Sequence, residues 1–414
     1  MENIESLKKK RWFYLCVGTV LLLFLGLIYA WSVFRVPLEA EFGWTQAQTS
    51  ITFSISMMMF CLGCLSGGII TGRKGHRATL VICAAVLFAG FMSASRIDSL
   101  AGIYVSYGVL CGYGVGLGYN CSISTVIKWF PDRQGLASGV SMMGFGLGAL
   151  LLGTVGAKMI EVMGWRQTFM IFAVLFAVIV LVCMALLKTA SQGFVDAMLA
   201  GSAKAEPSIE ELGPGEMVRR KNFWLLLSWI IVLSSAGLAI INNAAPLAQT
   251  VIVGDLTKAA AVAGILSVFN GIGRVVMGIL FDRFGYRAAM LATDGLMLAG
   301  GAVLLLNIGA QSYILLVIGF ILIGGGYGSI PSTFSAFAAH FFGRSHYSTN
   351  FGTLSLNLLV ASYLGPLCGG GDYRKTFMCI ITFAVIGFVL TVLIKRPKAV
   401  DVTEKNRAQE NIEL

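Results

Sequence analysis

The sequence predicts an all-α membrane protein with twelve transmembrane helices, arranged as two pseudo-symmetric six-helix bundles. Three observations predict this fold. The 414 residues are 57% hydrophobic and only 12% charged, whereas soluble proteins carry about 25% charged residues. Charged or glycine-rich breaks divide the chain into apolar runs long enough to cross a bilayer. Similar stretches also recur at a nearly constant shift along the chain.

The composition also excludes several classes of protein. So few charged residues cannot cover the surface of a soluble enzyme, and the hydrophobicity excludes a disordered chain. The net charge of +10 is explained by basic loops beside a membrane, so no nucleic-acid partner is expected. All nine cysteines lie inside apolar runs, where they act as small hydrophobic residues. We expect no disulfide framework, no metal and no cofactor.

The first six spans follow one another with short breaks. The first, 12–34, contains no charge and follows four basic residues, 8–11. It is longer than the apolar region of a signal peptide, so we expect a retained helix. Short polar breaks then separate five further spans, expected at 47–70, 78–96, 100–126, 135–158 and 166–187.

A longer polar segment, 188–222, separates the two halves and is expected to be a cytoplasmic linker. The second half repeats the pattern of the first, with spans expected at 223–248, 259–281, 288–307, 312–338, 349–370 and 375–394. We therefore expect an N-terminal bundle over 1–187, the linker, a C-terminal bundle over 223–395 and a cytoplasmic tail over 396–414.

Basic residues predict the orientation in the membrane. If the N-terminus is inside, cytoplasmic segments hold 22 of the 30 Lys and Arg residues and the outer loops hold seven. Cytoplasmic loops of membrane proteins carry such an excess of positive charge. We expect both termini in the cytoplasm of a multi-pass inner-membrane protein, which lies in the lipid bilayer as a monomer.

The halves contain matching motifs. The stretch 68–78 (GIITGRKGHRA) matches 278–288 (GILFDRFGYRA), and 164–170 (GWRQTFM) matches 372–378 (DYRKTFM). Glycine-rich segments, 112–116 and 324–328, also correspond. Parallel repeats of six helices are the architecture of major facilitator transporters, which hold substrate near the midplane between the halves.

The first pair of motifs predicts a gate. Asp282, Arg283 and Arg287 lie on a tight turn and can pair with neighbouring helix ends, which would latch one access state. Their counterparts in the first half include Arg73 and Arg77, but Gly72 replaces the acid, so a latch there is expected to be weaker. The alternative for either motif is a plain solvated turn.

The whole chain resembles the oxalate:formate antiporter branch of the major facilitator superfamily, which is related to the monocarboxylate transporters. The stretches that carry this resemblance are 11–14 (RWFY), 29–34 (YAWSVF), 128–139 (KWFPDRQGLASG), 215–219 (GEMVR) and 222–224 (NFW). The WFPDxxGxAxG pattern is fairly specific to this branch. The resemblance implies a secondary transporter that alternates access between its two halves.

Arg274 is the strongest candidate binding residue. No acid occurs between Asp255 and Asp282, and Arg274 lies roughly 12 Å inside the end of its helix. A buried guanidinium costs about 2.5–3.5 kcal/mol on insertion scales, so its missing anion is expected to be a substrate carboxylate. The alternatives are snorkelling or bonding to helix carbonyls. The resemblance implies a substrate-binding arginine at this position.

Asn270 lies one helical turn before Arg274, on the same face. The resemblance to animal monocarboxylate transporters implies an Asp here that is linked to proton coupling. An amide does not titrate, which argues against proton coupling at this position.

Other polar and aromatic side chains are expected around the same cavity. Tyr119 and Tyr327 follow the glycine-rich segments of the two halves, and the resemblance places cavity aromatics there and at Tyr29 and Trp31. Two amides in apolar runs are weaker candidates, Asn243 and Asn120. The alternatives are packing or helix–helix hydrogen bonds.

The eleventh span predicts the substrate class. It carries no Lys or Arg between Arg344 and Arg374, whereas the resemblance to oxalate transporters implies a lysine on this helix. One midplane charge suits one carboxylate, so we expect a carrier of small monocarboxylates of the lactate, pyruvate, formate or acetate type. A proton or a counter-anion remains open as the coupled partner. Asp294, the one acid inside a span, is expected to have a structural partner.

Three other functions remain open, and a membrane enzyme is disfavoured. The first is exchange of a dicarboxylate such as oxalate for a monocarboxylate. The second is a transport-silent sensor that uses the 188–222 linker. The third is a cation exporter, which would favour an exposed midplane acid instead of Arg274. A membrane enzyme has the least support, because the sequence shows neither an acidic metal cluster nor a nucleophile–base pair.

Overall fold

The computed structural model describes residues 4–200, 211–241, 243–252, 256–368 and 372–395, which form helices joined by short turns. The first half contains α1 (Ile4–Leu25), η1 (Gly26–Ala30), α2 (Trp31–Phe42), α3 (Gln46–Ala94), α4 (Leu100–Ile103), η2 (Tyr104–Cys111), α5 (Gly112–Ile127) and α6 (Gln134–Leu186). The segment between the halves contains α7 (Gln192–Ala200) and α8 (Pro214–Met217). The second half contains α9 (Lys221–Ile241), α10 (Ala244–Val251), α11 (Leu256–Ala310), α12 (Tyr313–Phe342), α13 (Tyr347–Ser355), α14 (Asn357–Leu367) and α15 (Tyr373–Leu393).

Three of these helices turn back on themselves at a glycine. Gly75 of α3, Gly164 of α6 and Gly285 of α11 have φ values of 82°, 79° and 82°, a backbone conformation that side chains with a Cβ rarely adopt. Eight helices in the described residues are long and apolar enough to cross a membrane. Because three of them cross twice and α13 with α14 adds one crossing, the described residues contain twelve spans.

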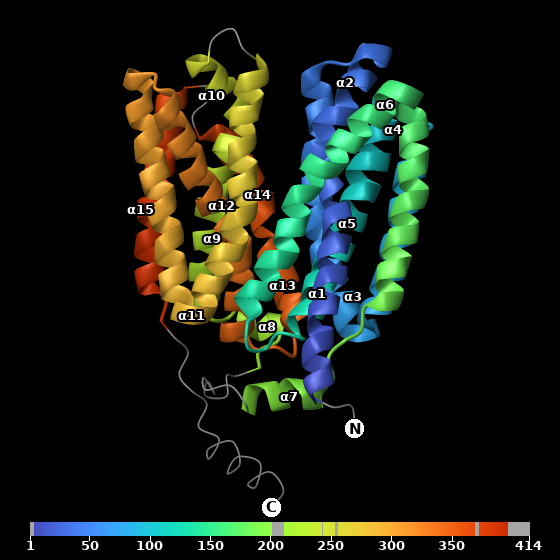
Figure 1. The fold of residues 1–414 in the computed structure, drawn as a ribbon, viewed down its shortest axis with the longest axis vertical. Coiled ribbons are helices and arrows are strands. Elements are labelled where there is room, and N and C mark those ends of the chain that lie inside the picture. The colour runs from blue at the N-terminus through green and yellow to red at the C-terminus, as the bar shows by residue number, and fades with distance from the viewer. Residues whose placement is uncertain (1–3, 201–210, 242, 253–255, 369–371, 396–414) are drawn as a thin grey trace, which may run out of the picture.

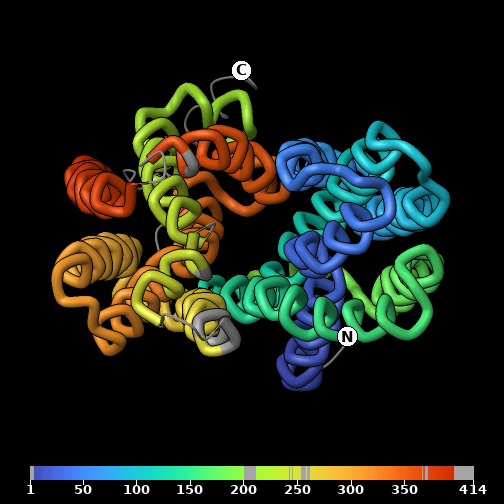
Figure 2. The backbone as a smooth tube through the Cα atoms, turned by 90° about the horizontal axis from the view of Figure 1, so that it is seen from above, coloured from blue at the N-terminus to red at the C-terminus, as the bar shows by residue number. Residues whose placement is uncertain are grey.

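The spans form two bundles that stand side by side (Figures 1 and 2). One bundle contains α1 to α6 and the other contains α9 to α15. The first helix begins, and α15 ends, at the same end of the molecule as α7 (Figure 1). We call this end the terminal face and the opposite end the outer face.

The two bundles touch closely near the terminal face. Gly135 and Gly139 of α6 lie against Gly278 and Arg274 of α11, so close that a Cβ on either α6 glycine would overlap with a backbone carbonyl of α11. The equivalent contact joins α3 to α13, where the Ser348 hydroxyl donates to the Gly68 carbonyl at 3.0 Å. Glycines let helix backbones approach in this way. The structure is therefore closed at its terminal face.

Two of the sequence stretches noted above pack together inside the first bundle. Arg11 of the RWFY stretch pairs with Asp132 of the WFPD stretch at 2.8 Å, and its guanidinium lies over the ring of Phe130. Tyr14 stacks on Trp129 with a centroid distance of 4.5 Å. These contacts join the start of α1 to the turn between α5 and α6.

Asp294 lies inside the second bundle and is fully buried. Its carboxylate accepts hydrogen bonds from the Trp229 indole of α9 at 2.9 Å and from the Thr391 hydroxyl of α15 at 2.7 Å. These partners give Asp294 a structural role, joining three helices of one bundle. They also show that it does not pair with Arg274.

We expect Trp229→Phe to lower the apparent melting temperature in detergent. Phenylalanine keeps most of the packing but leaves one oxygen of Asp294 without its donor, and an unsatisfied buried polar group costs about 1–3 kcal/mol. Trp224→Phe is the matched control, because it also removes an indole hydrogen bond, to the Val218 carbonyl, but at an exposed side chain. Equal melting temperatures for the two variants would show that the Trp229 hydrogen bond adds nothing to stability.

Candidate functional site

A small cavity of about 40 Å³ lies between the bundles. A space of about 10–15 Å³ holds one water, so this cavity has room for a few waters or a very small molecule. Both halves line it, with aromatic side chains predominating: Tyr29, Phe60, Tyr119, Phe145, Ser234, Arg274, Tyr327, Ile330, Pro331, Phe334, Ser355, Asn357 and Leu358. A larger cavity of about 360 Å³ is lined only by residues of the second bundle, so it does not lie between the halves.

Arg274 is the charged side chain of the cavity wall. It is 5% exposed, and Asn270 on the preceding turn accepts a hydrogen bond from its Nε at 3.2 Å. Its Nη1 donates to the Met142 carbonyl of α6 at 2.5 Å. Gly146 lies beneath the guanidinium, where a Cβ would be 3.7 Å from Cζ. Among the described residues no carboxylate pairs with Arg274, so its positive charge faces the cavity with neutral partners only.

The sequence left two alternatives to substrate binding for Arg274, snorkelling and bonding to helix carbonyls. The structure contains part of the second. The guanidinium does bond to a helix carbonyl, but that carbonyl belongs to the opposite bundle. Asn270 accepts from Nε and the Met142 carbonyl accepts from Nη1, so Nη2 is the guanidinium nitrogen that has no hydrogen-bond partner among the described residues. A carboxylate suits this position, since a guanidinium forms strong charge-assisted hydrogen bonds with one.

Three tyrosines line the cavity with Arg274. Tyr119 of α5 packs between Phe60 and Phe145, at centroid distances of 5.1 and 4.8 Å. Tyr29 of η1 also contacts Phe145, at 5.2 Å. Tyr327 of α12 lies against Gly237 of α9, where any side chain would overlap with its ring. Aromatic neighbours pack against Tyr29 and Tyr119, and the α9 backbone at Gly237 packs against Tyr327, so the three tyrosines come from both bundles.

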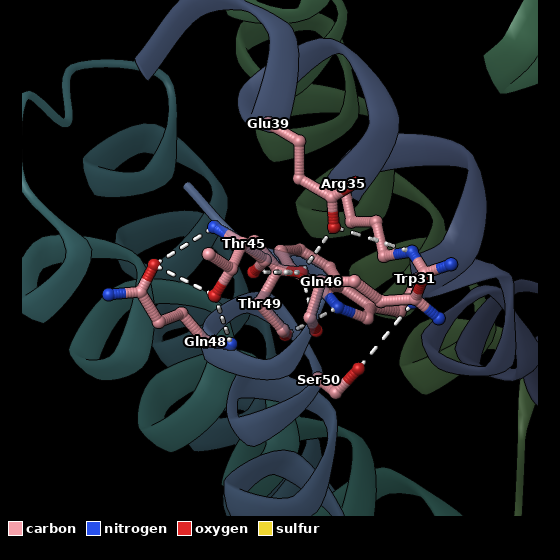
Figure 3. A network of polar contacts seen from close by, with 8 residues as sticks. All are labelled: Trp31, Arg35, Glu39, Thr45, Gln46, Gln48, Thr49 and Ser50. Atoms are coloured by element: carbon pink, nitrogen blue, oxygen red, sulfur yellow. Dashed lines mark hydrogen bonds and ion pairs between the residues drawn. The ribbon is translucent and has the colours of Figure 1, made fainter. Parts of the chain in front are cut away.

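Trp31 lies elsewhere in the first bundle and does not line the cavity. Its indole donates to the Thr49 carbonyl at 2.9 Å, and its ring packs on Tyr107 at 4.6 Å. It belongs to the polar network drawn in Figure 3, where Arg35 lies near Glu39 and Ser50 at 3.6 and 3.5 Å. Trp31 therefore joins α2 to α3. Its neighbour Tyr29, two residues earlier, is the aromatic that reaches the cavity.

The two weaker amide candidates also lie outside the cavity. Asn243 donates to the Ala239 carbonyl at 2.8 Å, where α9 passes into α10. Asn120 is fully buried and donates to two carbonyls, Cys64 of α3 at 2.8 Å and Ser348 of α13 at 2.9 Å. Asn120 thus belongs to the closed contact between the bundles and not to the cavity wall.

The repeated motif of the second half, 278–288, contacts a helix end. Both oxygens of Asp282 accept backbone hydrogen bonds from the first turn of α6, from Gly135 and Leu136 at 2.8 Å each. A carboxylate at a helix N-terminus is stabilised by unpaired N–H groups and by the helix dipole. Arg283 and Arg287 are exposed, and Arg287 lies over the ring of Tyr286.

The motif of the first half, 68–78, lacks the contact that Asp282 makes in the second half, as its sequence suggests. Arg73 and Arg77 are exposed and form no ion pair with a described residue. Gly72 occupies the position equivalent to Asp282, near the hydroxyls of Ser348 and Thr349 at the start of α13. No carboxylate of this motif caps α13 here, because a glycine stands at the equivalent position.

Three polar cavity residues were missed from the sequence: Ser234, Ser355 and Asn357. Asn357 is a polar residue in the apolar eleventh span, which was a usable signal. The break between α13 and α14 beside it was not visible in the sequence. The two serines are small and common in membrane helices, and no pattern distinguishes them.

Comparison with known proteins gives consistent similarities. The model of the Major Facilitator Superfamily matches residues 15–366 and 227–412. The oxalate:formate antiporter of Oxalobacter formigenes is 26% identical over 395 residues, covering 93% of this chain and 91% of that protein. The uncharacterised MFS-type transporter YhjX of Escherichia coli K12 is 26% identical over 360 residues, with coverages of 86% and 87%.

Two further similarities are a shorter sequence match and a solved structure. Monocarboxylate transporter 12 of Mus musculus is 32% identical over 157 residues, covering 38% of this chain and 32% of that protein. The proton:xylose symporter XylE, bound to 6-bromo-6-deoxy-D-glucose, superposes with a TM-score of 0.68 at 14% identity, covering 94% of this chain and 96% of that one. At that identity the likeness shows the fold alone, and it confirms the predicted fold class.

Proposed function

Because this chain belongs to the major facilitator superfamily, we propose that it carries small monocarboxylates across the membrane by alternating access between its two bundles. Arg274 binds the carboxylate, and Tyr29, Tyr119 and Tyr327 surround it. The observation that supports this most directly is the buried guanidinium between the bundles, whose described partners are a neutral amide and a backbone carbonyl. A buried charge without a counter-ion is costly unless a ligand supplies one.

The size and charge of the cavity support a small anion with one negative charge. Its volume of about 40 Å³ suits an acid of few heavy atoms, and Arg274 is the one Lys or Arg in its lining. The similarity to an oxalate:formate antiporter keeps a dicarboxylate as the second candidate. The eleventh span supplies Ser355, Asn357 and Leu358 to the lining, and none of these carries a positive charge.

We further propose that the terminal face is cytoplasmic, since the loops that carry most of the Lys and Arg residues are on the same side as the N-terminus. With that orientation, the contacts at Asp282 and Asn120 close the inner gate. The protein then presents its site to the outer side in this state. Inward opening would require both contacts to separate. The protein is proposed to work as a monomer, with 1–187 and 223–395 as its moving units.

We expect monocarboxylates to displace a labelled substrate far better than oxalate at pH 7. Doubly charged oxalate would leave one carboxylate without a cationic partner in the site, at a cost of about 1–3 kcal/mol or more. The measurement is counterflow. Proteoliposomes are loaded with unlabelled lactate, formate or acetate, and uptake of the labelled acid is measured while each unlabelled acid is added outside as a competitor. Equal or better competition by oxalate would favour exchange of a dicarboxylate. A failure of every acid to support counterflow would contradict carboxylate transport.

A further inference from the structure

Asn357 lines the same cavity as Arg274 and has an unused hydrogen-bond acceptor. It is the first residue of α14, directly after Leu356, the single residue between α13 and α14. Its side chain is almost fully buried, with the residue 2% exposed.

The local hydrogen bond decides which end of the amide remains unused. The Nδ2 group donates to the Leu354 carbonyl at 2.7 Å. A carbonyl can only accept, so the NH2 end of the amide must face Leu354 and Oδ1 must face away. Within the described part of the chain, Oδ1 has no hydrogen-bond partner.

The polar residue two positions earlier in the chain does not supply the missing donor. The Ser355 hydroxyl, also in the cavity wall, donates to the Phe351 carbonyl at 2.8 Å. Oδ1 itself has almost no accessible surface. A buried acceptor without a donor is costly, so a donor that reaches this oxygen from the cavity would be favoured.

We propose that the substrates of this carrier are 2-hydroxy carboxylates, such as lactate or glycolate. The carboxylate binds Arg274, and the hydroxyl on the adjacent carbon donates to Asn357 Oδ1. Unsubstituted acids have no donor at that carbon, and 2-oxo acids have only an acceptor there. This inference rests on the proposed function, since it requires that Arg274 binds a carboxylate in this cavity.

The test compares acids that differ only at the second carbon. Lactate, propionate and pyruvate share a three-carbon skeleton and one carboxylate. Their affinities are measured by calorimetric titration of the purified full-length protein in detergent. Both enantiomers of lactate are titrated, because the two place their hydroxyls in different directions once the carboxylate is bound. We expect the better enantiomer to bind at least about tenfold more tightly than propionate or pyruvate, as sites built around a substrate hydroxyl discriminate strongly.

Variants of Asn357 assign this discrimination to one side chain. Asn357→Leu is nearly isosteric and apolar, and Asn357→Ala is a second variant in case the first misfolds. In either protein lactate and propionate should bind with the same affinity. Asn350→Ala is the matched control, because Asn350 is also buried, also has an unpartnered Oδ1 and lies on the same span outside the cavity. It should keep the wild-type ratio.

The possible failures are distinguishable. Equal binding of lactate and propionate by the wild-type protein would overturn the inference and leave monocarboxylate transport intact. A lactate preference that survives in the Asn357 variants would also overturn it. If none of the three acids binds the wild-type protein, the proposed function itself fails.

Discussion

Arg274→Ala is expected to abolish carboxylate uptake while the protein still inserts and purifies normally. The guanidinium is the positive charge of the cavity, and removing it takes away the proposed hydrogen bonds to the carboxylate. Stability should change little, because the described partners of Arg274 are the neutral Asn270 amide and the Met142 carbonyl. Truncation therefore leaves no unpaired buried charge, which is the usual cause of collapse when an ion pair is broken.

Arg274→Lys should also be strongly impaired. Lysine keeps the charge but loses the planar fork that grips a carboxylate with two bonds. It also loses the Nε–H that Asn270 holds in place. Rescue of uptake by lysine would mean that charge alone, and not geometry, carries binding.

The decisive measurement is labelled-carboxylate uptake in proteoliposomes together with thermal stability in detergent. Arg374→Ala is the control, because Arg374 is exposed and outside the cavity between the bundles. Wild-type uptake by Arg274→Ala would show that the guanidinium serves only the contact with α6. A large loss of stability would point to the same structural role through Met142.

The fold and the central charge could be predicted from the sequence for simple physical reasons. A span must be apolar over its whole length, so its existence is visible locally, and a single arginine in such a run stands out. Asp282 could also be predicted to contact a helix end, because the repeat places it on a turn. Each of these predictions rests on a pattern that is visible along the chain itself.

Predictions that depended on the face of a helix were less successful. Trp31 and Tyr29 lie two residues apart, and only the 3₁₀ segment η1 and its packing determine that Tyr29 reaches the cavity. Asn120 directly follows Tyr119, yet it points to carbonyls of α3 and α13. Its partner Ser348 is 228 residues away in the chain. Such contacts are tertiary, and no local pattern in the sequence contains them.

The gate offers a test in which two substitutions should act in opposite directions. Asp282→Asn is expected to favour separation at the terminal face, because an amide loses the negative charge that the two N–H groups of α6 stabilise. Gly72→Asp is expected to favour closure. Gly72 is the equivalent position in the first half, and a Cβ there would lie 3.5 Å from Ser348 Oγ and 3.7 Å from Thr349 Oγ1. A carboxylate therefore fits beside the first turn of α13.

The populations of protein open and closed at the terminal face can be measured by cysteine labelling, in a background without the nine native cysteines. A single cysteine at Met143, on the α6 face that meets Gly271 of α11, reports opening from the terminal side. A hydrogen bond to a charged group contributes about 1.5–3 kcal/mol. Each carboxylate should therefore shift the ratio of open to closed protein, measured by this labelling, by about tenfold or more. Gly72→Asn is the control for side-chain size without charge. The latch would be refuted if Asp282→Asn left the ratio unchanged, or if both acid changes moved it in the same direction. Opposite shifts would show that the closed state is held by carboxylates on helix N-termini, with one such contact in the natural sequence and room for a second.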